Sequence, residues 1–130
     1  MAIYPTSEQI QALLAGPADQ PVVMVNLLRF KAHADAPDEG MSGEEAYERY
    51  FKTMRGLVES NGGRIIWAGS VDSMVIGEAD PSFDIVAFVE YPSRAKFVEI
   101  AQSERVREIG VHRAAGLESQ WLIAATPRPL

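Results

Sequence analysis

The sequence contains no cysteine among its 130 residues. Disulfides, thiolate nucleophiles and cysteine-bound metals are therefore excluded. An excess of positive charge is also missing: 12 lysines and arginines stand against 18 aspartates and glutamates, which gives a net charge of −6. Because nucleic-acid binding needs a basic patch to neutralise phosphates, we expect no nucleic-acid partner.

Long hydrophobic runs are absent as well. No apolar stretch approaches the roughly 20 residues that span a bilayer. The segment 1–5 lacks the basic region and hydrophobic run of a secretory signal. We therefore expect no membrane association and a cytoplasmic location. Phosphate-binding loops, Rossmann glycine patterns and nucleophile elbows are missing too, so no motif indicates a reaction or a cofactor.

What the sequence does contain is an ordered series of patterns across residues 21–125: strand, helix, strand, strand, helix, strand. This order is typical of the ferredoxin-like split βαβ plan. We predict an α+β domain over residues 21–130 with a four-stranded antiparallel sheet, preceded by an extra N-terminal helix within residues 1–20. The predicted strands cover residues 22–31, 64–77, 84–91 and 117–125, with a bulge or bend expected at Gly69.

Helix starts are marked by capping residues. Thr6–Gln9 and Ser42–Glu45 have the spacing of capping boxes, in which the cap side chain and the third residue bond each other's backbone N–H groups. Ser93 is the predicted cap of the second long helical region, and Ser103 is a candidate for restarting it. Asp80–Pro81 indicates a turn between two antiparallel strands.

The predicted strands are apolar on both faces. In the first strand Val22, Met24 and Leu28 share one parity, while Val23 and Val25 share the other. Helices in one chain can cover only one face of such a sheet, and the other face would expose a large apolar surface. A second copy packed sheet to sheet would bury it, so we predict a homodimer.

Several segments resemble the domain-of-unknown-function 1330 family, with a likeness that spans about residues 21–125. The segments that carry it are Asn26–Lys31, Ala46–Tyr50, Gly62–Gly69, Val89–Ser93, Phe97 and Arg113–Leu117. The resemblance implies a dimeric α+β barrel and no particular activity. The wider superfamily includes cofactor-free monooxygenases, lactone-type isomerases, haem-binding enzymes and ligand-binding proteins, so the fold is a poor guide to function.

Asn26 and Arg29 are the first candidate site residues. Asn26 is the one uncharged polar residue in its apolar strand, and a buried amide needs hydrogen-bond partners. It can orient a substrate carbonyl or serve as a satisfied structural amide. Arg29 has the opposite parity, so the two need not share a pocket. Arg29 can hold a carboxylate or pair with a nearby acid.

Aromatic residues form the second group. Trp67 and Trp121 lie in different predicted strands, and Tyr47 and Tyr50 lie on the first long helix. They can line a pocket between helix and sheet, or simply fill the core.

His112 and Arg113 form the third group, near the end of the last predicted helix. His112 can act as a general base or a haem ligand, or it can stabilise the helix dipole without any catalytic role. Arg113 can bind an anion at the mouth of a pocket.

The segment His33–Glu39 gathers residues of metal-ligating types in one loop, but their spacing matches no recognised site. We expect a solvated acidic loop there and no metal. No cofactor is expected either, although added haemin would test for haem binding.

Two functions compete. The first is a pocket for a small organic molecule, partly aromatic or acidic, in a ligand-binding protein or a cofactor-free enzyme. Asn26 would orient a carbonyl, Trp67 and Tyr47 would pack a ring, and Arg29 or Arg113 would hold a carboxylate. The alternative is a non-catalytic dimeric binding or structural module. It predicts that all aromatics are core and that no cavity of about 300 Å³ or more exists.

Overall fold

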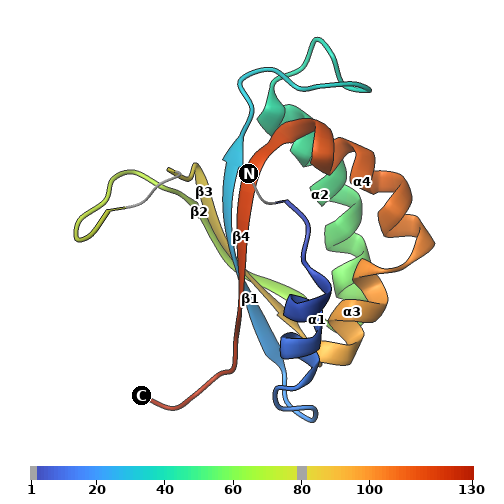
Figure 1. The fold of residues 1–130 in the computed structure, drawn as a ribbon, viewed down its shortest axis with the longest axis vertical. Coiled ribbons are helices and arrows are strands. Elements are labelled where there is room, and N and C mark those ends of the chain that lie inside the picture. The colour runs from blue at the N-terminus through green and yellow to red at the C-terminus, as the bar shows by residue number, and fades with distance from the viewer. Residues whose placement is uncertain (1–2, 79–81) are drawn as a thin grey trace.

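The computed structural model describes residues 3–78 and 82–130. It has the predicted ferredoxin-like α+β fold with an additional N-terminal helix (Figure 1). The elements in chain order are α1 (Ser7–Leu14), β1 (Val22–Phe30), α2 (Gly43–Ser60), β2 (Arg64–Ser70), β3 (Ile85–Tyr91), α3 (Arg94–Ala101), α4 (Glu104–Gly116) and β4 (Leu117–Ala125).

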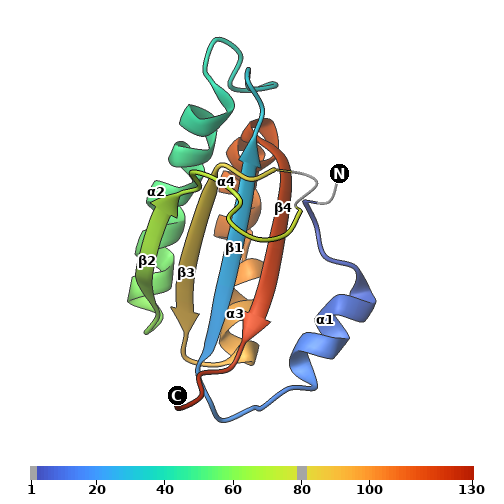
Figure 2. The same ribbon diagram turned by 90° about the vertical axis from the view of Figure 1, so that its left-hand side faces the viewer.

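The four strands form one antiparallel sheet in the order β2-β3-β1-β4. Helices α2, α3 and α4 lie in a layer against one face of this sheet (Figure 1). Helix α1 lies beside the edge of the sheet that β4 forms (Figure 2). None of the helices in the described residues is both long and apolar enough to cross a membrane.

Alternation along the strands places the core between sheet and helices. Val22 and Met24 of β1 are buried, and they pair across the sheet with Tyr91 and Val89 of β3. Because paired residues in an antiparallel sheet point to the same face, these four side chains form one apolar surface toward the helices. The helical residues that pack into the same core come from α2. They include the buried Tyr50, Met54 and Val58, which follow one another at successive turns of the helix.

The predicted caps begin four helices. Thr6 and Ser42 complete capping boxes with Gln9 and Glu45. Ser93 caps α3 and Ser103 caps α4, so the second helical region is two helices, as the Ser103 signal indicated.

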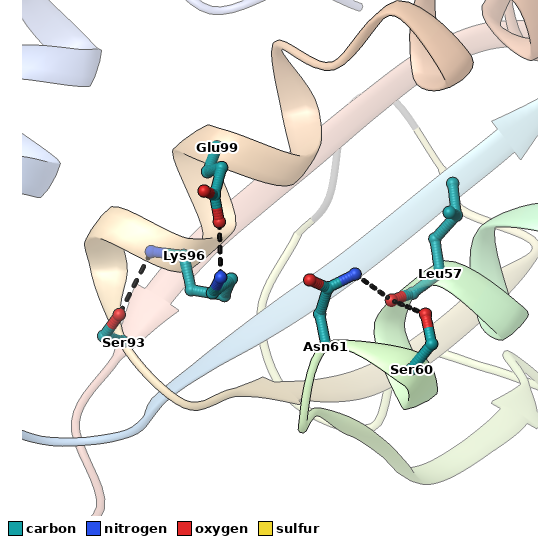
Figure 3. A network of polar contacts seen from close by, with 6 residues as sticks. All are labelled: Leu57, Ser60, Asn61, Ser93, Lys96 and Glu99. Atoms are coloured by element: carbon teal, nitrogen blue, oxygen red, sulfur yellow. Dashed lines mark hydrogen bonds and ion pairs between the residues drawn. The ribbon is translucent and has the colours of Figure 1, made fainter.

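Figure 3 shows side chains satisfying backbone groups where α2 ends and α3 begins. The side chains of Asn61 and Ser60 both donate to the Leu57 carbonyl, at 2.8 and 3.2 Å. The Ser93 hydroxyl accepts the Lys96 amide at 3.0 Å. These bonds define both helix ends locally, because terminal N–H and C=O groups lack partners within their own helix.

The second strand is shorter than predicted. It ends at Ser70, and residues 71–78 leave the sheet as an irregular arm. The register shift lies between Ile65 and Trp67, not at Gly69. Gly69 instead accommodates the Trp67 indole, because a Cβ there would overlap the Cη2 atom of the ring. The turn predicted at Asp80–Pro81 lies outside the described residues.

The opposite face of the sheet stays apolar and open. Within the described residues no helix covers it, and Trp67 and Trp121 are 53% and 46% exposed there. The arm, defined as residues 71–78, projects away from the helices (Figure 1) and carries Val75 and Ile76 at 88% and 90% exposure.

Two glycines bring α2 and α4 into backbone contact at one end of the helical layer. The Gly116 carbonyl accepts the Lys31 amide at 2.8 Å, and the Lys31 carbonyl accepts the Gly43 amide at 3.0 Å. A Cβ on Gly116 would overlap the Gly43 carbonyl oxygen and lie 3.0 Å from the Tyr47 amide nitrogen. Both obstacles are backbone atoms, which cannot move aside without shifting a helix.

We therefore expect Gly116→Ala to lower the free energy of unfolding by about 1–3 kcal/mol, measured by urea denaturation. The matched control is Gly56→Ala in α2, where a Cβ meets nothing within 4 Å. That change should stabilise the protein by up to about 1 kcal/mol, because alanine favours the helix. Equal stabilisation by both substitutions would contradict the close helix contact.

Candidate functional site

A cavity of about 1580 Å³ lies between the sheet and the helical layer. Its walls come from β1, β3 and β4 on one side and α2, α3 and α4 on the other, and α1 with the segment before it also contributes to the lining. Apolar side chains such as Met24, Phe51 and Leu122 make up much of the lining.

A chain of polar side chains crosses one wall of the cavity. The Arg113 Nη2 donates to Gln120 Oε1 at 2.6 Å, and Gln120 Nε2 donates to Asn26 Oδ1 at 3.0 Å. Asn26 Nδ2 in turn donates to the Met24 carbonyl at 3.2 Å. Each amide is thereby fixed in orientation, with its second donor or acceptor sites left for other groups.

Three tyrosines form the aromatic part of the site. Tyr47 and Tyr50 come from α2, with ring centroids 5.4 Å apart, and Tyr91 comes from β3. Their hydroxyls donate no hydrogen bond to any described residue, although all three side chains border the cavity. Burial raises the pKa of all three phenols, and neighbouring phenols raise it further for Tyr47 and Tyr91. The hydroxyls therefore stay protonated and are available as hydrogen-bond donors.

The N-terminal segment is tied to this site. Arg113 donates to the Ile3 carbonyl, and its guanidinium lies 5.4 Å from the centroid of the Tyr4 ring. Further along, Arg94 Nη1 donates to the Leu13 carbonyl at 3.4 Å. Residues 3–14 thus form a strap that is held at both ends along the edge of the cavity.

The structure brings four of the predicted site residues together and places Trp121 at their border. Asn26, Tyr47, Tyr50 and Arg113 all line the cavity. Trp121 also borders it, but its indole packs edge to face against Phe83 at 5.1 Å.

The structure does not place Arg29 and Trp67 with the other predicted site residues, because neither borders the cavity. Arg29 has the opposite parity to the buried Leu28, and Trp67 pairs with Phe88 on the open face of the sheet. The position of a residue along its strand decides which face its side chain occupies, because successive side chains in a strand point to opposite faces.

His112 also lies outside the cavity. Its Nδ1 is 2.7 Å from Asp38 Oδ2, and Arg49 Nη1 donates to the other oxygen of the same carboxylate at 2.6 Å. Asp38 is only 2% exposed, so the loop predicted to be solvated in fact buries one of its acids between α2 and α4. This cluster pins the loop to both helices, a structural role that the sequence did not indicate.

Sequence reasoning missed several polar residues that line the cavity, among them Gln120, Tyr91 and Arg94. Gln120 carries the same signal as Asn26, an uncharged amide within an apolar strand. Tyr91 shares the parity of the buried Val89. Arg94 has no such signal, because its burial depends on α1 folding back over it. In the described part of the chain, no group of three acidic or histidine side chains could hold a metal ion.

Comparison with known proteins identifies relatives without a known activity. The family model of the domain of unknown function DUF1330 matches residues 40–126. A crystal structure of a protein of unknown function from Rhodopseudomonas palustris is 37% identical, with a TM-score of 0.89 and 98% of each chain covered. No curated protein matches this sequence.

More distant structures share the fold. The hydroxynitrile lyase from Passiflora edulis has a TM-score of 0.60 at 10% identity, covering 86% of this chain and 97% of the lyase. A hypothetical protein from Arabidopsis thaliana has a TM-score of 0.53 at 18% identity, covering 90% of this chain and 96% of that one. At these identities the likeness concerns architecture alone.

The buried phenols predict a loss of stability in alkali. The pKa of Tyr47 is about 10 when the chain is unfolded and is raised in the folded protein. Above about pH 10 the unfolded chain releases this proton more readily than the folded protein does. The stability that the buried phenol contributes is therefore complete at lower pH and falls as the pH rises. Urea denaturation between about pH 8 and about pH 11 should show a shallower alkaline decline for Tyr47→Phe, by up to about 1.4 kcal/mol per pH unit. Parallel curves would rule out this burial effect.

Proposed function

The chain belongs to the DUF1330 family, which has no assigned activity, and we propose that its cavity binds a small organic molecule. The observation that carries this proposal is the cavity itself. Its volume of about 1580 Å³ leaves ample room for a small organic molecule, since small-molecule sites typically have volumes of roughly 300–1,000 Å³. An apolar lining with a few convergent polar groups is also the usual composition of such sites.

Each part of the lining has a distinct role in this proposal. Tyr47 and Tyr50 offer ring surface and free hydroxyl donors to the ligand. Asn26 is held by Gln120 and can orient a carbonyl or hydroxyl group. Arg113 supplies positive charge beside them. Preorganised donors of this kind cost little reorganisation on binding.

The lining favours binding over acid–base catalysis. Among the described residues that border the cavity there is no aspartate, glutamate, histidine or lysine. Burial raises the pKa of its tyrosines further away from neutrality. A general base is most effective when its pKa lies near the working pH, and none of these groups fits that requirement. The size of the cavity supports this proposal over a purely structural module, for which we expect a filled core.

We also propose that two copies assemble as a homodimer through the open face of the sheet, in the cytoplasm. Trp67, Trp121 and Ile123 give this face an apolar surface that a second copy would bury. The arm projects on the same side (Figure 1), where Val75 and Ile76 could pack against the partner. A two-fold axis would let both arms make the same contact.

The binding proposal is tested by native mass spectrometry of freshly purified, undialysed protein. We expect an adduct on the wild-type protein that is lost in Gly110→Leu. Gly110 borders the cavity on α4, and a Cβ there meets nothing within 4 Å, so a leucine would project into open space.

Gly56→Leu is the matched control, because it adds the same side chain at an open helix position away from the cavity. It should keep the adduct. A bare wild-type mass, or an adduct that survives Gly110→Leu, would count against a ligand in this cavity.

The dimer is tested by light scattering at micromolar concentration. Combining Trp67→Glu with Ile76→Glu should raise the dissociation constant about tenfold or more, because both side chains would enter the interface as charges. Leu14→Glu is the control, since Leu14 is 47% exposed on α1, away from the open face. A monomeric wild-type protein would overturn the proposal.

A further inference from the structure

The charge on the cavity walls is opposite in sign to that of the whole chain. The protein carries a net charge of −6, yet three arginines and no carboxylate border the cavity among the described residues. These arginines are Arg94, Arg107 and Arg113. Although the sequence has 18 acids, none of those in the described residues lies at this wall, so the lining is positively charged in an acidic protein.

Arg94 is the most deeply buried of the three. It is only 8% exposed, and its guanidinium packs against Gly16, where a Cβ would lie 2.6 Å from Cζ. Its hydrogen bonds go to the Leu13 carbonyl and, at 2.8 Å, to the Thr126 hydroxyl. Neither partner carries a negative charge, and no carboxylate in the described residues lies within ion-pair distance of it.

Arg113 is the cation nearest to the polar part of the cavity. Only its Nη2 donates, to Gln120 and to the Ile3 carbonyl. Its Nη1 and Nε have no hydrogen-bond partner among the described residues. Neither atom is fully buried, so both remain accessible. The charge of Arg113 acts on Tyr47 and Tyr50, whose free hydroxyls therefore lie in its field.

Burying a cation without a counter-ion costs free energy, and an anion that enters the site relieves that cost. We propose that the ligand of this cavity is an organic acid: its carboxylate binds Arg113 and the tyrosine hydroxyls, and its apolar body lies against the aromatic lining. This inference rests on the proposed binding function. Arg94 contributes a favourable potential without needing direct contact.

A carboxylate fits both the donors and the lining of this cavity. A guanidinium presents paired donors that match the two oxygens of a carboxylate, and neutral phenols can add further bonds. The lining otherwise consists mostly of apolar and aromatic side chains, which suit a hydrocarbon body with one charged end.

The test compares two probes of nearly the same shape, naphthylacetate and naphthylacetamide, by isothermal titration calorimetry on the full-length protein. The acid should bind about tenfold more tightly than the amide, or better, because hydrogen bonds to charged groups are stronger than neutral ones. Arg113→Gln should weaken the acid to the level of the amide and leave the amide itself almost unaffected.

Arg55→Gln is the matched control. Arg55 pairs with Glu59 on α2 and does not border the cavity, so its loss removes one positive charge without touching the site. It should retain the preference for the acid. If Arg113→Gln does not fold, Arg113→Lys keeps the charge without the paired donors and should give an intermediate preference.

Equal affinity for the two probes, or an acid preference that survives Arg113→Gln, would overturn the inference and leave the proposed binding function in place. Failure of both probes to bind would also overturn it. The adduct experiment with Gly110→Leu then decides independently whether the cavity binds any molecule.

Discussion

The backbone contact between Gly43 and Gly116 is the constraint on which the rest of the structure depends. It joins α2 to α4 at one end of the helical layer, and Lys31 links both helices to the end of β1. Close approach at this end fixes where the following turns of α2 lie over the sheet. Tyr47 follows Gly43 by one turn of the helix, so its position in the cavity is a consequence of a contact that only glycine permits.

Electrostatics separates the cavity from the buried polar cluster beside it. Asp38 has Arg49 and His112 as partners, and all three groups thereby satisfy one another within the fold. Arg94 and Arg113 have only neutral partners in the described residues. Each cluster contains a buried charged residue, Asp38 in the first and Arg94 in the second, but only the second leaves charge uncompensated among the described residues, and it does so at the wall of a cavity. That difference is why we assign a ligand to one cluster and a structural role to the other.

The fold could be predicted from the sequence because local signals agreed with one another. Capping boxes at Thr6 and Ser42 indicated helix starts, and the nearly continuous apolar run in residues 22–31 indicated a strand with two apolar faces. The end of β2 could not be predicted, since apolar residues continue to Ile76 although the chain leaves the sheet at Ser70. An apolar arm and an apolar strand have the same composition, and only pairing with β3 distinguishes them.

The sequence by itself determined the element order, the sheet with two apolar faces and the place of Asn26 as the one uncharged polar residue in an apolar strand. Tertiary structure decided which side chains share a cavity. Trp67 and Arg29 lie on the open face because of their positions along their strands. His112 contacts Asp38 because α4 packs against the loop that contains Asp38. Arg94 gained its place from α1, which lies far from it in the chain. Local patterns follow from neighbouring residues, whereas a site depends on distances between elements that only their packing sets.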